Sequence, residues 1–151
     1  MENRQVQSIY VNLIKASQNV QKGLFEICRE ENIKVNDFLV LGALYQWGAQ
    51  SILSISKNVL IKSGSMTYII DKLEKKELIY RTPSKEDRRV ILIDLTEEGY
   101  KQAEKLYNAE LEMFARMFEK ASKKTLDNAP SELRELRDVS DAFVEENGFK
   151  Y

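Results

Sequence analysis

The chain has 151 residues, of which 43% are hydrophobic and 31% are charged, and its formal net charge is −1. This length and composition predict one domain with one hydrophobic core. The sequence has no His and a single Cys, so it lacks the commonest general base, the commonest nitrogen ligand of zinc and any intramolecular disulfide. These absences argue against an enzyme, and we expect no catalytic residues, no metal site and no cofactor.

No apolar run approaches the roughly 18 residues that span a membrane, and the first residues, MENRQVQSIY, lack the apolar stretch of a secretory signal. We therefore expect a cytoplasmic protein without membrane contact. The charge is unevenly distributed, because residues 54–89 contain nine Lys and Arg but only five Asp and Glu. A basic middle segment favours binding to a polyanion, although alternating charges on exposed helices give similar counts.

The first half of the chain predicts helices. Apolar residues recur at three- and four-residue steps through the first 30 residues, which indicates a long amphipathic helix with an apolar stripe. Asn36 or Asp37 can cap a second helix that ends near Gly48. This second helix is apolar around much of its circumference, so we expect it to be central.

Two short helices follow. Ser51 can cap a helix that runs through Val59, and a brief turn at residues 60–61 leads to Ser63, which can cap the next helix. Two short helices joined by a tight turn form a helix-turn-helix, whose second helix reads DNA. We expect that second helix to bury Met66, Ile69, Ile70 and Leu73, and to expose Ser65, Thr67, Tyr68 and Lys72.

The period then falls to two, which predicts a hairpin with strands at 78–81 and 90–95 and a charged loop at 82–87. Thr96 can cap a further long helix that continues towards Lys120. We expect a break at 122–129, a last helix that starts at Pro130, and its end at Gly148. The predicted fold is mainly α with a small β-hairpin wing, a winged helix-turn-helix with long terminal helices.

Residues 62–72 carry groups suited to a DNA groove. The small residues Ser63, Gly64 and Ser65 leave room at the start of the helix, where free backbone N–H groups can bind a phosphate. Thr67 and Tyr68 are candidates for contacts with base edges, whereas Lys62 and Lys72 are candidates for phosphate contacts.

The hairpin loop adds a second group of cations. Asp87 lies two residues before Arg89, so in an extended strand both side chains point to the same side and the carboxylate can orient the guanidinium. An oriented Arg enters a narrow minor groove at lower entropic cost. Lys85 and Arg88 are candidates for phosphate contacts. The alternative is an ordinary surface ion pair between Asp87 and Arg89, which contributes little.

Four segments of the chain resemble the MarR family of dimeric winged-helix transcription regulators: SGSMTYIIDKLEKK (63–76), LIYR (78–81), KEDRR (85–89) and LTEEG (95–99). The resemblance implies a single domain over 1–151, with dimerisation helices at 1–34 and 100–147 and a DNA-binding lobe at 36–99. It also implies that the first and last helices of two chains interdigitate, and that two lobes bind a pseudo-palindromic operator in double-stranded DNA. By this match Ser63, Gly64, Ser65 and Thr67 face the major groove, and Arg89, oriented by Asp87, faces the minor groove.

The chain departs from the family pattern at two turns, because Leu60 and Glu77 stand where many relatives have Gly.

The sequence therefore predicts a DNA-binding repressor that acts as a homodimer and is released by a small-molecule effector or by thiol modification. Two alternatives remain open. One is a winged helix used only for protein interaction, without DNA binding. The other concerns Cys28: some family members sense oxidants through a Cys near the first helix, but a free Cys is more commonly an apolar filler.

Overall fold

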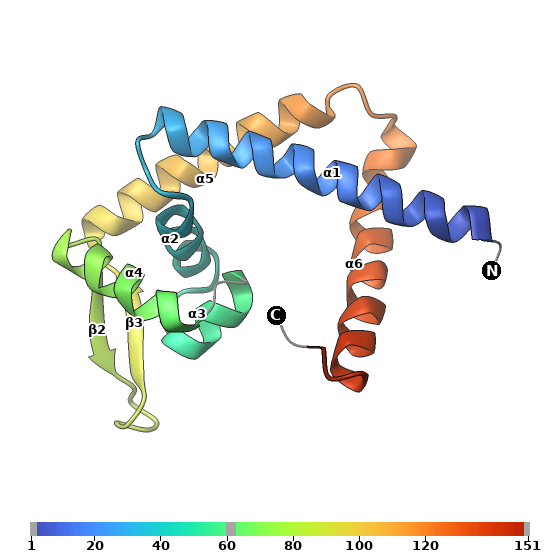
Figure 1. Ribbon diagram of the computed structural model, residues 1–151. Helices are drawn as coiled ribbons and strands as arrows, with labels where there is room; N and C mark the ends of the chain where they lie inside the picture. The colour runs from blue at the N-terminus through green and yellow to red at the C-terminus, as the bar shows by residue number, and fades with distance from the viewer. Residues whose placement is uncertain (1–2, 60–62, 150–151) are drawn as a thin grey trace. The chain divides into compact units, whose positions relative to one another are not determined.

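The computed structural model describes residues 3–59 and 63–149, with the backbone alone at 63 and 64. The chain divides into two compact units, 1–114 and 115–151. The elements in chain order (Figure 1) are α1 (Asn3–Glu30), α2 (Val35–Trp47), β1 (Gln50–Ser51), α3 (Ile52–Val59), α4 (Ser63–Lys75), β2 (Ile79–Pro83), β3 (Ile91–Leu95), α5 (Glu97–Phe118) and α6 (Lys123–Glu146). The mainly helical fold with a small hairpin is confirmed.

The core of the first unit lies between α2, α3, α4 and the sheet, which pack against one another (Figure 1), and the end of α1 and the first half of α5 add buried residues to it. Phe38, Leu41 and Leu44 of α2 are buried, so its predicted central position is confirmed. The predicted inner face of α4 is also confirmed, because Met66, Ile69, Ile70 and Leu73 are all buried. Burying each such side chain stabilises the fold by about 1.5–3 kcal/mol, which fixes which face of α4 remains outside.

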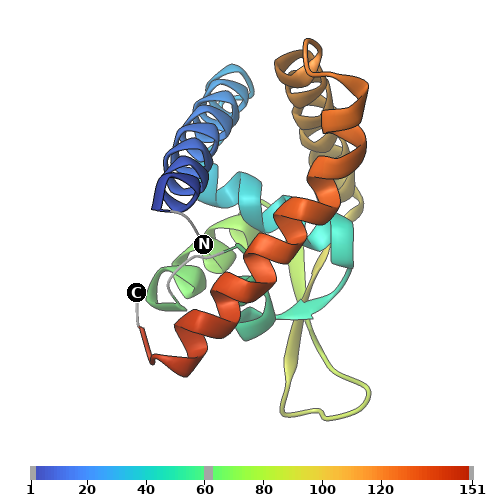
Figure 2. The same cartoon turned by 90° about the vertical axis from the view of Figure 1, so that its right-hand side faces the viewer.

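The sheet is antiparallel with strand order β1-β3-β2. The hairpin was predicted, but β2 extends to Pro83, which lies opposite Ile91, so the loop covers 84–90 and starts two residues later than the predicted 82–87. Strand β1 was not predicted, because two residues are too short to show a period. The loop between β2 and β3 extends beyond α3 and α4 of the same unit (Figure 2), as a wing does.

Local capping signals were mostly correct. Ser51 accepts a hydrogen bond from the Ser54 N–H at 3.2 Å, and Thr96 accepts one from the Gly99 N–H at 3.0 Å. Gly48 ends α2 with a positive φ of 71°. The predicted cap of α2 was wrong, because α2 already starts at Val35 and Asp37 lies in its first turn, bonded to another helix. For Ser63, the predicted side-chain cap lies outside what the structure describes, as does the turn at 60–61.

Gly99 permits the close approach of α5 to the backbone of Leu78, the residue before β2. A Cβ atom at this position would lie 1.8 Å from the carbonyl oxygen of Leu78. The same carbonyl accepts the N–H of Thr96 at 3.1 Å, and the Thr96 hydroxyl donates to the carbonyl of Glu77 at 2.6 Å. The Gly of the LTEEG segment is therefore required by packing.

The second unit corrects the prediction for the end of the chain. Ser122 caps α6 by accepting the Thr125 N–H at 3.2 Å, so the helix begins at Lys123 and Pro130 lies inside it. The expected break at 122–129 was wrong, since the local capping signal at Ser122 prevails over the preference of Pro for a first turn. The end near Gly148, which has a φ of 64°, is confirmed.

Two helices keep apolar stripes whose side chains are largely exposed within the described parts of the chain. Val6, Ile9, Tyr10 and Leu13 are exposed on α1, which buries side chains only towards its end. On α6 no residue is buried, and Leu133, Val139 and Phe143 are exposed. Among the described helices, none is long and apolar enough to cross a bilayer.

Candidate nucleic-acid interface

The outer face of α4 carries polar and aromatic side chains. Ser65, Thr67 and Tyr68 are exposed, with 66% of Tyr68 accessible, while the next residues along the helix are buried. Ser63 and Gly64 form the first backbone positions of α4, and Lys62 lies outside the described residues. Hydroxyl groups of Ser, Thr and Tyr can donate to and accept from base edges and phosphates. This face therefore has the chemistry of a groove reader.

Lys72 does not lie free on that face as the sequence predicted. Its ammonium donates to Oδ1 of Asp37 at 2.6 Å and also contacts Oδ2. Asp37 is 2% exposed and Lys72 22%. The pair joins the start of α2 to the later part of α4, so Lys72 first holds the reading helix in place. Sequence spacing does not reveal this contact because the two residues are 35 positions apart.

Arg81 on β2 holds α4 from another side. Its guanidinium donates to Asp71 at 2.5 Å and to Glu74, both on α4. The hydrogen bond to Asp71, together with the neighbouring carboxylates, raises the pKa of Arg81. Sequence reasoning missed this role, although Asp71 and Glu74 are three residues apart and thus share one helix face. Arg81 and Lys72 together fix the orientation of α4 relative to the wing and to α2.

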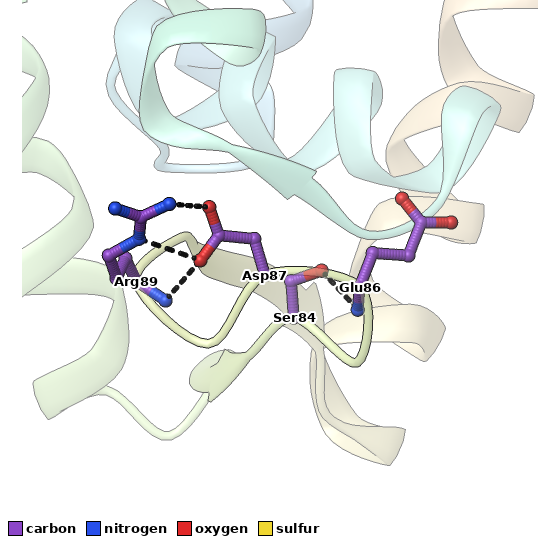
Figure 3. A network of polar contacts seen from close by, with 4 residues as sticks. All are labelled: Ser84, Glu86, Asp87 and Arg89. Atoms are coloured by element: carbon purple, nitrogen blue, oxygen red, sulfur yellow. Dashed lines mark hydrogen bonds and ion pairs between the residues drawn. The ribbon is translucent and has the colours of Figure 1, made fainter.

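The wing contains an oriented arginine, as predicted (Figure 3). The carboxylate of Asp87 accepts the Arg89 N–H at 3.0 Å and its Nε at 3.1 Å through Oδ1, and Nη2 at 3.1 Å through Oδ2. These hydrogen bonds lower the pKa of Asp87. The side chain of Arg89 is still 91% exposed. Asp87 therefore orients the guanidinium through Nε and Nη2 while most of the side chain remains in solvent.

The geometry of this pair differs from the prediction. The carbonyl of Asp87 accepts the Val90 N–H at 2.9 Å, which makes residues 87–90 a turn and not an extended strand. Asp87 therefore reaches Arg89 because its side chain bonds the backbone two residues ahead, an Asx turn. Ser84 acts similarly on the N–H of Glu86 at 3.2 Å (Figure 3). Lys85 and Arg88 are exposed on the same loop.

Cys28 lies near the end of α1 and is 4% exposed. Burial raises the pKa of its thiol, and the charge of Glu110 raises it further. The thiol is therefore protonated at neutral pH, whereas the reactive form of a sensing cysteine is the thiolate. This environment matches an apolar filler better than a redox sensor.

Comparisons with known proteins identify the family and the fold. The MarR family model matches residues 33–91, which include α2, α3, α4 and most of the hairpin. MhqR of Bacillus subtilis, an HTH-type transcriptional regulator, is 35% identical over 91 residues, which make up 60% of this chain and 63%, less than two thirds, of MhqR. YpoP of B. subtilis, an uncharacterized regulator of the same type, is 30% identical over 107 residues, 71% of this chain and 75% of YpoP.

Among solved structures, a MarR family protein from Bacillus stearothermophilus superposes with a TM-score of 0.79 at 21% identity, covering 93% of this chain and 99% of that one. The helix-turn-helix, the three-stranded sheet and the projecting loop define a winged-helix protein. The chain belongs to the MarR family, and both relatives named above are HTH-type transcriptional regulators.

Proposed function

We propose that this chain binds double-stranded DNA as a homodimeric transcription repressor, with one winged lobe of each protomer on each half of a pseudo-palindromic operator. The observation that carries this proposal is the bidentate hold of Asp87 on the exposed Arg89 at the wing tip. An exposed guanidinium that a neighbouring carboxylate already orients loses little side-chain entropy on entering a minor groove.

In this proposal the outer face of α4 reads the major groove. Ser63, Gly64 and Ser65 place the helix start near the phosphates, and Thr67 and Tyr68 contact base edges. Lys62, Lys85 and Arg88 contact phosphates, which position the protein without reading sequence. Lys72 contributes mainly by holding α4 through Asp37, since its ammonium already has a carboxylate partner.

The apolar stripes on α1 and α6 support the homodimer. A second copy of the chain would cover Val6, Ile9 and Leu13 of α1, and Leu133 and Phe143 of α6, which are exposed. We assign 1–34 and 100–147 to dimerisation and 36–99 to DNA binding. Two lobes held in this way read half-sites about 34 Å apart, one turn of the double helix.

We further propose that a small-molecule effector releases the repressor by changing the separation of the two lobes, in the cytoplasm where promoter DNA lies. A ligand achieves this only if it binds one arrangement more tightly than the other. The buried, protonated thiol of Cys28 supports a non-covalent effector over thiol modification as the signal.

The test measures DNA affinity by fluorescence anisotropy at a stated salt concentration. One duplex carries the DNA upstream of the gene that encodes this chain, and the other is a scrambled duplex of equal length. We expect tighter binding to the upstream region and a steep loss of affinity as salt rises, because released counterions drive phosphate contacts. Arg89→Ala should weaken binding, whereas Lys101→Ala, an exposed cation on α5, should not. Equal affinity for both duplexes refutes sequence-specific regulation. No affinity for either duplex refutes DNA binding and favours the alternative, a winged helix used only for protein interaction.

A further inference from the structure

A hollow with a volume of about 450 Å³ lies between the end of α1, the start of α2 and the end of α4. The residues proposed above to contact bases or phosphates do not line it, and neither do the apolar stripes of α1 and α6. Its volume is within the range of sites for small molecules, roughly 300–1,000 Å³. The side chains that give it its chemistry are Arg29, Lys34, Lys72, Lys76, Asp37 and Ile33.

The charges around this hollow do not balance. Arg29 pairs with Glu26 at 2.5 Å, and Lys72 pairs with Asp37. Lys34 and Lys76 are exposed, and the structure records no ion pair for either within residues 3–59 and 63–149. Two positive charges therefore remain. Lys76 lies one helical turn after Lys72, with its N–H bonded to the Lys72 carbonyl at 3.2 Å, so both side chains lie on one face.

Helix dipoles explain some of these cations but not Lys34. A cation near the end of a helix, as at Arg29 or Lys72, is favoured by the exposed carbonyl groups there. Lys34 instead occupies the N-cap of α2 and makes no side-chain cap, so a cation stands at the positive end of the helix. A bound anion would offset the repulsion between Lys34 and the helix start.

We propose that this hollow is a binding site for a small dianion, with a phosphate group or two carboxylates as its charged part. The dianion contacts the ammonium groups of Lys34, Lys72 and Lys76, and any apolar part lies against Ile33. Charge-assisted hydrogen bonds from three ammonium groups give selectivity for two negative charges over one.

The dianion site is placed to influence DNA binding. A neighbouring hollow of about 380 Å³ shares Lys34, Asp37 and Lys72, and is also lined by Ser65 and Tyr68 of the outer face of α4. A dianion bound by Lys34, Lys72 and Lys76 lowers the positive potential next to that face. We therefore expect the dianion and DNA to weaken each other's binding by the same factor, a step that rests on the proposed function.

The first experiment titrates the full chain with inorganic phosphate, without DNA, by calorimetry at constant ionic strength. We expect saturable binding, and a Kd about tenfold higher in each of Lys34→Gln and Lys76→Gln. The matched control is Lys75→Gln, which changes an exposed lysine of α4 that does not line the hollow. Undetectable binding, or an equal loss in Lys75→Gln, overturns the proposal.

Two further arms define the ligand and the coupling. Succinate should compete with phosphate while acetate at equal ionic strength should not, and competition by acetate overturns selectivity for a dianion. Phosphate should also lower the operator affinity of the wild-type chain. This loss should be several-fold larger than the loss that phosphate causes in Lys34→Gln. Phosphate binding with unchanged operator affinity keeps the site and refutes the coupling. A chain that binds phosphate but no DNA keeps the site and refutes the proposed function instead.

Discussion

Asp37 and Lys72 form an ion pair between the first turn of α2 and the later part of α4, with Nζ and Oδ1 2.6 Å apart. The carboxylate is almost fully buried and the ammonium is mostly so. Since a buried charge without its partner is costly, this pair constrains where the reading helix can lie relative to α2. It also borders both hollows beside α4.

Removing Lys72 should be more damaging than neutralising Asp37. Lys72→Met leaves the buried carboxylate unpaired, and we expect a loss of about 3 kcal/mol in the free energy of unfolding. Asp37→Asn should cost less, because the partly exposed ammonium can turn to water. Urea denaturation of both variants and of the double variant measures this difference. If Asp37→Asn is the more destabilising change, the burial of the carboxylate is not the controlling cost.

Gly99 gives a sharp prediction about packing. In Gly99→Ala the new Cβ would lie 1.8 Å from the Leu78 carbonyl oxygen, so backbone must move, and we expect a loss of about 3 kcal/mol in stability. Gly42 is the control, because it lies inside α2 with no atom within 4 Å of a Cβ built there. Gly42→Ala should stabilise the chain by about 0.5–1 kcal/mol through helix propensity. Thermal unfolding distinguishes the two, and equal effects would contradict the packing argument.

Glu77 adopts a φ of 57°, the left-handed conformation that glycine adopts without strain. It follows α4 and precedes Leu78, whose carbonyl contacts the start of α5. Glu77→Gly should therefore raise the free energy of unfolding by about 1 kcal/mol, because the steric strain of a Cβ in this region disappears. Glu77→Ala keeps a Cβ and should give no such gain, so a gain of equal size in both variants would assign the effect to the lost charge.

Much of this architecture could be predicted because its signals are local. The inner face of α4 follows from a 3.6-residue period, and the caps at Ser51 and Thr96 involve bonds that span three residues. The contact of Asp87 with Arg89 was predicted for the same reason, even though a turn and not a strand brings it about. The match to the family also depended on this local order of helix, strand, loop and strand.

The contacts that fix the orientation of α4 could not be predicted in this way. Asp37 resembled a helix cap by its type and position, and only the packing of α2 on α4 shows that Lys72 is its partner. Arg81 resembled an ordinary strand cation until the fold placed Asp71 and Glu74 beside it. Pro130 was misleading, because the cap at Ser122 sets the start of α6 at Lys123, seven residues earlier.

The interaction between Asp87 and Arg89 in the wing should not change with pH over the neutral range. The pKa of Asp87 is lowered by its hydrogen bonds to Arg89, so the charged form is favoured in the folded wing. Because the pKa of Asp87 is lower in the folded chain, the stabilisation from its ionised carboxylate is complete above the ordinary pKa of Asp. It is lost only as the pH falls through the lowered value. Operator affinity measured from pH 5 to 8 should thus show no step from Asp87. Asp87→Ala should weaken operator binding several-fold while the melting temperature stays unchanged, whereas an unaltered affinity would mean that Arg89 needs no orientation.

Cys28 should react slowly in the folded chain. Burial first, and the charge of Glu110 second, raise the pKa of its thiol, so little thiolate is present at pH 8. We expect alkylation by iodoacetamide to be at least tenfold slower in the native chain than in 6 M guanidinium chloride, because both access and ionisation are reduced. Glu110→Gln removes the second cause and should speed native alkylation modestly at pH 8. Native alkylation as fast as in the unfolded chain would restore Cys28 as a sensor candidate, and a paired assay of operator binding after alkylation would then measure its effect on DNA affinity.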